Sequence, residues 1–247
     1  MEDVTIRAAA FDFTGCEGCQ LNVGNLETQL PTLLQYITFV EFRLVSSAEY
    51  DGPIDIAFVE GAISKEEDIE RVRSVRERAS VLVAMGACAD LGGVNRLVSE
   101  ETLQKAREGE YGKMIQSLGV FTPAPVSKFV KVDHALPGCP IDRNEFLRVV
   151  GDLVARRKPR IPDYAVCHEC RQSGKGCLLD HGKMCVGMIT RGGCDAVCTV
   201  GGAGCEGCRG LIPDANVDAM VATLTGLGHE RRDAVNLIRQ FLKPGLE

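Results

Sequence analysis

The sequence contains no tryptophan, and its aromatic residues amount to only 5%. It also lacks an apolar run near the roughly 18 residues that a membrane-spanning helix needs. Its first residues, MEDVTIRAAAFDF, show no basic segment followed by an apolar stretch and no twin arginine, so no export signal is visible. A net charge of −6 offers no basic surface for phosphates. We therefore expect a soluble, cytoplasmic protein with no membrane span and no nucleic-acid partner.

Cysteine, by contrast, is abundant, with twelve in a chain of 247 residues. Disulfides are disfavoured in a reducing cytosol, which makes metal or redox chemistry the better explanation. One isolated thiol could pack as a small apolar side chain. Eight thiols between Cys167 and Cys208 are not explained in that way.

The first 150 residues alternate apolar runs with helical patterns. The apolar runs predict strands at 6–13, 37–45, 54–59, 81–85 and 129–132. The helical patterns predict helices at 20–35, at 64–79 with Ser64 and Glu67 as a capping box, and from Asp142 onward. This alternation predicts an α/β domain whose parallel sheet is covered on both faces.

The pattern changes near Pro159–Pro162, where we place a domain boundary at about residue 160. From 167 to 210 glycine and cysteine dominate and no regular period is sustained. Such a long irregular stretch is unusual in a compact domain unless metal clusters cross-link it. Two helices are predicted to close the chain, at 216–224 and 230–242.

Four cysteines follow predicted strands. Cys16 and Cys19 come after the first strand, Cys88 after the fourth and Cys139 after the fifth. The carboxyl ends of parallel strands lie along one edge of the sheet, so we expect these thiols to converge there. Four thiolates suit either a tetrahedral zinc site or a [4Fe–4S] cluster.

The other eight cysteines divide by proximity into two quartets, with spacings C-x2-C-x6-C-x7-C and C-x3-C-x6-C-x2-C. Other groupings among the eight stay open. A zinc ribbon would pair two C-x2-C knuckles across about 15–20 residues, which the intervening cysteines do not fit. A ferredoxin-type C-x2-C-x2-C-x3-C-P run is absent. A redox dithiol at Cys16 and Cys19 would leave Cys88 and Cys139 unexplained.

Several segments together resemble the small subunit of [NiFe] hydrogenases, over essentially the whole chain. They are FTGCEGCQLNVGNLE, DIAFVEGAISKEEDIE, VAMGACADLGGV, LPGCP and CHEC…CLLDHGKMC…TRGGC…GCEGCRG. The chain is most similar to the delta- and gamma-type subunits of cytosolic multimeric enzymes. This resemblance implies a flavodoxin-like domain at 1–160 and a smaller, loop-rich iron–sulfur domain at 161–247.

The resemblance also implies three [4Fe–4S] clusters and no catalytic residue on this chain. The proximal cluster would take Cys16, Cys19, Cys88 and Cys139. The medial cluster would take Cys194, Cys198, Cys205 and Cys208. The distal cluster would take Cys167, Cys170, Cys177 and Cys185.

Two positions depart from the periplasmic relatives, which have histidine where this chain has Cys167 and often proline where it has Cys198. Ligation by cysteine alone keeps more negative charge at a cluster and should lower its reduction potential. The related subunit of NADH–quinone oxidoreductases fits less well, because it has adjacent cysteines in its first motif and lacks the C-terminal quartets.

The resemblance implies an electron-transfer subunit that works with a hydrogenase large subunit and an electron-accepting iron–sulfur or flavin subunit. The acceptor would be a NAD(P)-reducing or related module, with a heterodisulfide reductase or ferredoxin-linked module as the alternative. Two further alternatives stay open: a cluster-bearing scaffold whose partner lacks nickel, and a zinc-stabilised interaction module.

Two glutamates, three glycines and the four histidines are the other candidate functional residues. Glu17 and Glu60 could face a partner or tune a cluster, or they could be ordinary loop and capping carboxylates. Gly86, Gly92 and Gly93 are predicted to allow close backbone approach to the first site, and they do not form the G-x-G-x-x-G of a nucleotide site. The four histidines are expected at the surface.

Overall fold

A computed structural model describes residues 5–109, 112–117 and 119–242. The chain divides into two compact units, Met1–Pro159 and Arg160–Glu247. Within the described ranges, no helix is both long enough and apolar enough to cross a lipid bilayer.

The first unit is built on a five-stranded parallel sheet with the order β2-β1-β3-β5-β7. Its strands are β1 (Ile6–Asp12), β2 (Ile37–Phe42), β3 (Ile54–Glu60), β5 (Ala79–Met85) and β7 (His134–Leu136). If the five strands of this sheet are numbered by their order along the chain, the sheet order is 2-1-3-4-5. This is the order of the flavodoxin-like doubly wound fold. The predicted flavodoxin-like α/β fold is therefore confirmed. A separate antiparallel pair joins β4 (Ile63–Lys65) and β6 (Val120–Ala124).

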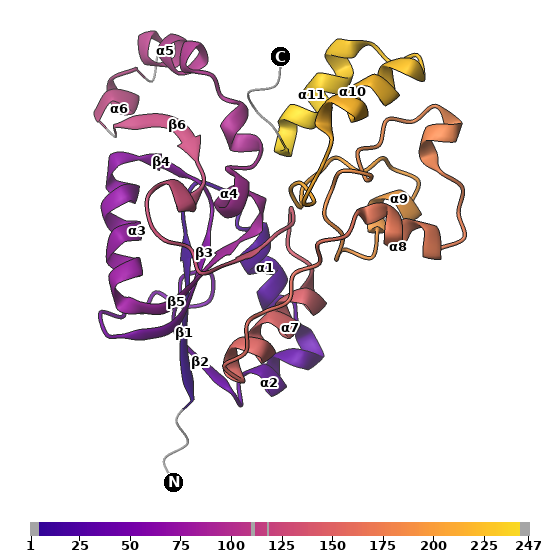
Figure 1. Ribbon diagram of the computed structural model, residues 1–247. Coiled ribbons are helices and arrows are strands. Elements are labelled where there is room, and N and C mark those ends of the chain that lie inside the picture. The colour runs from indigo at the N-terminus through magenta and orange to yellow at the C-terminus, as the bar shows by residue number, and fades with distance from the viewer. Residues whose placement is uncertain (1–4, 110–111, 118, 243–247) are drawn as a thin grey trace. The chain divides into compact units, whose positions relative to one another are not determined.

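Helices cover both faces of this sheet. Helix α3 (Glu66–Arg78) lies on one face, and α1 (Gly18–Gly24) and α7 (Arg143–Val154) lie on the other (Figure 1). Val72 and Val75 of α3 are fully buried in a core that includes Val59 of β3. The preceding side chain of β3, Phe58, points to the opposite face and contacts the Phe146 ring of α7 at 5.2 Å between centroids.

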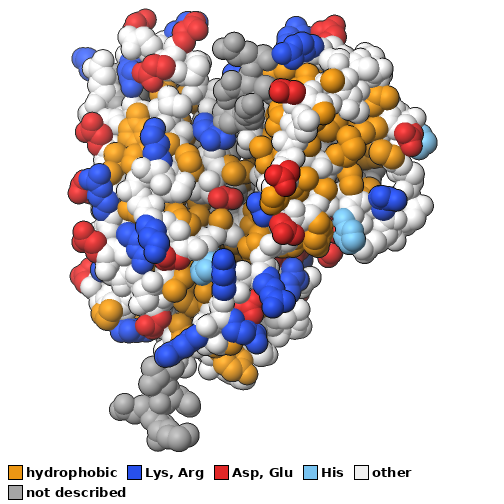
Figure 2. All heavy atoms as spheres, in the orientation of Figure 1, with side chains coloured by type: hydrophobic (Ala, Val, Ile, Leu, Met, Phe, Trp, Pro, Cys, Tyr) orange, Lys and Arg blue, Asp and Glu red, His pale blue; other side chains and the backbone are white. Residues whose placement is uncertain are grey.

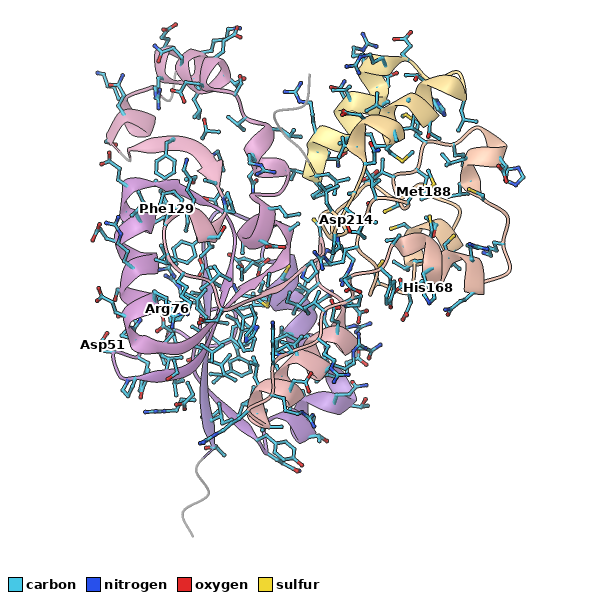
Figure 3. The ribbon with its side chains drawn as sticks, in the orientation of Figure 1. Asp51, Arg76, Phe129, His168, Met188 and Asp214 are labelled. Atoms are coloured by element: carbon cyan, nitrogen blue, oxygen red, sulfur yellow. The ribbon has the colours of Figure 1, made fainter. Side chains whose placement is uncertain are left out.

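The outer face of α3 carries mixed charge, as its many glutamates and arginines predict. Figure 2 shows acidic and basic side chains interspersed over this part of the first unit. Arg73 and Glu70 form an exposed pair at 2.8 Å. Arg76, labelled in Figure 3, instead turns inward to Asp133, at 2.5 Å between nitrogen and oxygen.

The predicted fifth strand, 129–132, is wrong. The strand that pairs with β5 at this edge is β7, only three residues long, and its His134 pairs in register with Val83 of β5. The apolar residues that suggested the strand follow a 3₁₀ turn at Val126–Lys128 and pack against the α3-side core. Phe129, labelled in Figure 3, contacts the Phe121 ring at 5.9 Å.

The predicted helix at 20–35 is also wrong as a single element. It is divided into α1, a 3₁₀ turn at Glu27–Gln29 and the short helix α2 (Leu30–Leu33). Gly24 and Asn25 end α1, and Pro31 stands in the first turn of α2, where proline is tolerated. Leu21 of α1 is 53% exposed, so the leucines of 20–35 do not share one buried face.

The capping box predicted at Ser64 does not form. Ser64 belongs to β4, and its hydroxyl lies 2.5 Å from the hydroxyl of Thr14. Helix α3 begins at Glu66. The predicted start at Asp142 is confirmed for α7, because the Asp142 carboxylate accepts the amide of Glu145 at 2.7 Å.

The remaining elements of the first unit are α4 (Gly86–Leu91), a 3₁₀ turn at Val94–Leu97, α5 (Glu100–Glu108) and α6 (Gly112–Ser117). Of these, α4 contacts β3, β5 and β7, whereas α5 lies beside α6 and β6 (Figure 1). The second unit contains α8 (Val166–Gln172), a 3₁₀ turn at Leu178–His181, α9 (Val197–Val200), α10 (Val217–Gly226) and α11 (Arg231–Phe241). The two closing helices are confirmed, and α8 corrects the expectation that 167–210 is wholly irregular.

Candidate metal centre

The first four cysteines follow the carboxyl ends of three strands of the parallel sheet. Cys16 lies in the loop after β1, and Cys19 is in the first turn of α1. Cys88 is in α4, directly after β5, and Cys139 is in the turn after β7. The amide of Ala87 donates to the carbonyl of Gly138 at 2.7 Å, which ties the start of α4 to the turn that carries Cys139.

These four thiols are close enough for their charges to interact. Burial raises the pKa of Cys88 to about 11, and the negative charges of Cys139, Cys16 and Glu60 add to the shift. Burial also raises the pKa of Cys19, together with Glu60 and Cys139. Clustered thiolates repel one another unless a cationic centre binds them, and ligation requires the deprotonated form. This donor set therefore fits an iron–sulfur centre.

Two glycines bring the backbone against the sulfurs. A Cβ on Gly86, which has a φ of +85°, would lie 2.4 Å from the Cys19 sulfur. A Cβ on Gly93 would lie 2.9 Å from the Cys88 sulfur. Gly92, the third glycine singled out by the sequence, instead ends α4 and faces the side chain of Arg96.

Glu60 supports the loop that carries Cys19. Its carboxylate, 3% exposed, accepts the amides of Cys19 at 3.0 Å and Gln20 at 2.9 Å. Burial raises the pKa of Glu60, although both hydrogen bonds oppose that shift. Of the two roles left open by the sequence, the structure shows the capping one, supplied to α1 from the end of β3. Glu17 is exposed and has a φ of 59°.

Sequence reasoning missed Asn95. Its side-chain amide donates to the Cys88 sulfur at 3.4 Å and to the carbonyl of Thr14 at 3.1 Å. It therefore links the Cys88 segment to the loop that carries Cys16. Asn95 comes two residues after Gly93, one of the glycines predicted to approach the first site. This position was the sequence signal of its role.

Four cysteines of the second unit also come together. Cys167 and Cys170 lie on α8, Cys177 is exposed in the following loop, and Cys185 is buried. Burial raises the pKa of Cys167 to about 11, and the charges of Cys185, Cys170 and Cys177 add to it. The charges of these four thiols therefore lie within reach of one another.

The last four cysteines form two neighbouring pairs. Cys194 interacts electrostatically with Cys198, and Cys205 with Cys208. Burial raises the pKa of Cys205 to about 12, and Cys185 contributes to the shift. The amide of Cys205 also donates to the Cys185 sulfur at 3.3 Å. Cys205, predicted in the medial set, therefore lies beside Cys185, predicted in the distal set.

None of the twelve cysteines, all of which lie in the described ranges, forms a disulfide. Among the residues that the structure describes, no three histidine, cysteine, aspartate or glutamate side chains converge on one point as ligands of a single metal ion. A four-iron cluster takes one thiolate at each iron, so its ligands need not share such a point.

The histidines add no ligand set to these cysteines. His168, on α8 and labelled in Figure 3, lies against the Tyr164 ring at 4.9 Å. His181 is exposed, whereas His134 and His229 are half-buried, which corrects the expectation of four surface residues. Burial lowers the pKa of His134.

The sequence matches known proteins along most of its length. A family model described as the NADH ubiquinone oxidoreductase 20 kDa subunit matches residues 16–153. Sulfhydrogenase 2 subunit delta of Pyrococcus furiosus is 36% identical over 220 residues, covering 89% of this chain and 92% of the relative. A vhu subunit of the F420-non-reducing hydrogenase of Methanocaldococcus jannaschii is 28% identical and covers 99% of this chain and 97% of the relative.

A solved hydrogenase structure also matches this chain. A chain in the crystal structure of a NAD+-reducing [NiFe]-hydrogenase in the H2-reduced state matches with a TM-score of 0.51 and 27% identity. The match covers 64% of this chain and 96% of that one. The chain therefore belongs to the NADH ubiquinone oxidoreductase 20 kDa subunit family and, within it, to the small subunits of [NiFe] hydrogenases.

Proposed function

We propose that this chain is the electron-transfer small subunit of a [NiFe] hydrogenase and that its three sets of four cysteines hold three [4Fe–4S] clusters. The observation that carries the proposal is the convergence of Cys16, Cys19, Cys88 and Cys139 at the carboxyl edge of the sheet, with Gly86 leaving space beside a sulfur. The relatives that span both units are hydrogenase subunits, which supports the same assignment.

The chain is thus a subunit of an oxidoreductase that acts on hydrogen, and the catalytic metal site belongs to its partner. Bound iron–sulfur clusters supply one-electron transfer. The residues of this chain hold and tune them. Glu60 fixes the start of α1, and the Asn95 amide donates to the Cys88 sulfur, which favours the reduced state. Burial of Cys19 and Cys205 excludes water from part of each site.

We place the large subunit against the edge that carries the first site. Cys16 and Cys139 are exposed there. Next to Cys88, the turn at Val94–Leu97 exposes two apolar side chains, Val94 by 41% and Leu97 by 49%. An apolar patch beside exposed ligands fits a protein interface.

The proposed acceptor is a cytoplasmic NAD(P)-reducing or related iron–sulfur or flavin module. The alternative is a heterodisulfide or ferredoxin-linked module. The chain of the NAD+-reducing enzyme matches only 64% of this chain, whereas the sulfhydrogenase and F420-non-reducing relatives cover 89% and 99%. Acceptor assays should therefore include ferredoxin and a heterodisulfide beside NAD and NADP.

The test is co-purification with a hydrogenase large subunit and H2-driven reduction of a dye. Val94→Asp should release the large subunit while iron content is kept, because a charge would be buried at the interface. Val45→Asp is the control, since Val45 is 72% exposed in the loop after β2. A chain that keeps its iron yet shows no affinity for a hydrogenase large subunit would refute the proposal.

A further inference from the structure

Glu169 lies on α8, but its carboxylate binds a different segment, the loop that carries Cys194. One oxygen accepts the amide of Gly193, and the other accepts the amide of Ala196 at 3.0 Å. The backbone amides on both sides of Cys194 are therefore held by one side chain. Glu169 itself stands between two cysteines of the neighbouring quartet.

This loop needs external support. Asp195 and Ala196 have φ values of 53° and 51°, a left-handed conformation that residues other than glycine rarely adopt. Two such residues in succession are held only where the surroundings fix them. The hydrogen bond from Ala196 to Glu169 provides one such constraint.

The other side of the loop is equally confined. The amide of Gly192 donates to the carbonyl of Tyr164 at 2.8 Å, and the Tyr164 hydroxyl donates to Glu169 at 3.0 Å. A Cβ on Gly192 would lie 2.5 Å from the Tyr164 ring and 3.0 Å from Glu169. Arg209, 1% exposed, donates to the carbonyl of Gly192 at 2.7 Å.

We propose that Glu169 is a positioning residue that fixes the Cys194 loop and, through its negative charge, lowers the reduction potential of the cluster held by Cys194. Reduction adds an electron, and a nearby carboxylate makes that addition less favourable. The inference rests on the proposed cysteine ligation.

The test is a redox titration of the anaerobically purified holoenzyme, followed by electron paramagnetic resonance. In Glu169→Gln the midpoint of the cluster that depends on Cys194 should rise, because the charge is removed, and it should rise more than that of the neighbouring quartet in which Glu169 stands, while the midpoint of the first cluster should stay unchanged. Glu206→Gln is the matched control. Glu206 is an exposed carboxylate next to Cys205 that contacts Gln240 at 3.3 Å, so its removal should move that midpoint less.

The variant Cys198→Ser identifies which electron paramagnetic resonance signal belongs to the quartet that contains Cys194. If neither Cys194→Ser nor Cys198→Ser changes any signal, the proposed ligation fails, and the role of Glu169 fails with it. If the signal is present but Glu169→Gln leaves its midpoint unchanged, or shifts all three midpoints equally, only the role of Glu169 is refuted.

A second variant covers the case in which Glu169→Gln does not retain its clusters. Tyr164→Phe removes one hydrogen bond to Glu169 and leaves the carboxylate charge less compensated. Tyr164 is 41% exposed, so this variant spares the buried core. We expect the midpoint of the same cluster to fall. An unchanged or higher midpoint would overturn the inference.

Discussion

At Gly86 the backbone passes so close to the Cys19 sulfur that a single methyl group has no space. Its φ of +85° also disfavours any other residue. Gly86→Ala should therefore displace Cys19 and remove about four irons per chain, the content of one [4Fe–4S] cluster. The measurement is iron and sulfide per chain after anaerobic purification.

Gly151→Ala is the matched control for this prediction. Gly151 lies inside α7, and a Cβ there would meet nothing within 4 Å. Iron content should be unchanged and stability slightly higher, since alanine favours helices. If both alanine variants keep all their iron, the first site accommodates the methyl group, and the close approach of Gly86 to the Cys19 sulfur is not required for the cluster.

Asp133 provides a prediction about pH. Its carboxylate accepts the amide of Leu82 at 2.9 Å and pairs with Arg76. Burial by itself would raise the pKa of Asp133, but these hydrogen bonds outweigh it and the pKa is lowered. Asp133→Asn should reduce the free energy of unfolding at pH 7 by about 1–3 kcal/mol, the usual cost of a broken charged hydrogen bond.

The sign of the pH dependence follows from the lowered pKa. The carboxylate stabilises the fold fully above its unfolded pKa of about 3.9, and this contribution is lost as pH falls through the lower folded value. The gap in thermal midpoint between wild type and Asp133→Asn should be constant from pH 7 to about pH 5 and narrow below about pH 4. Asp51→Asn, at an exposed loop position, should show no gap. A gap that widens in acid would contradict this explanation.

At the scale of elements, α7 depends on Asp142, the N-cap residue that precedes it. The Asp142 carboxylate caps the helix, and Phe146 one turn later packs on Phe58 of the sheet. Asp142→Ala should cost about 1 kcal/mol of stability, the typical loss for an N-cap. Urea unfolding followed by circular dichroism measures it. A loss above about 3 kcal/mol, beyond the range for a cap alone, would mean that Asp142 also supports the neighbouring Cys139 turn.

Four of the five parallel strands could be located from the sequence because each lies within an apolar run; β1, β3 and β5 are inner strands, and β2 is an edge strand with partly exposed side chains. The edge strand β7 could not be, because it spans three residues and begins with His134. The apolar run at 129–132 packs against a core without forming a strand. Apolar character reports burial, and only tertiary contacts separate a buried strand from a buried loop.

The candidate ligand cysteines could be predicted from the sequence, but the side chains that support them could not. Cysteine spacing and the strand-end rule predicted the convergence of the first four thiols. The supporting side chains were not predictable by spacing, because Glu60, Asn95 and Glu169 act on segments that are distant in sequence or belong to another cysteine set. Their contacts appear only once the loops are folded.

At the scale of the whole molecule, we predict that electrons exchange with the acceptor module through the set that begins at Cys167. Cys167→His removes a thiolate charge and should raise the potential of that cluster. H2-driven reduction of the low-potential acceptor should slow, while reduction of a dye that accepts electrons earlier should be largely kept. Equal loss of both activities, with iron content unchanged, would contradict the proposed order.

The most direct test of the central claim is metal analysis of the anaerobically purified chain with its partners. Three sets of four cysteines predict about twelve irons and twelve sulfides per chain, with substoichiometric zinc. Replacing Cys198 should remove or convert one cluster and leave the other two. Stoichiometric zinc with negligible iron and sulfide would show that the cysteines hold structural ions and that this chain does not conduct electrons.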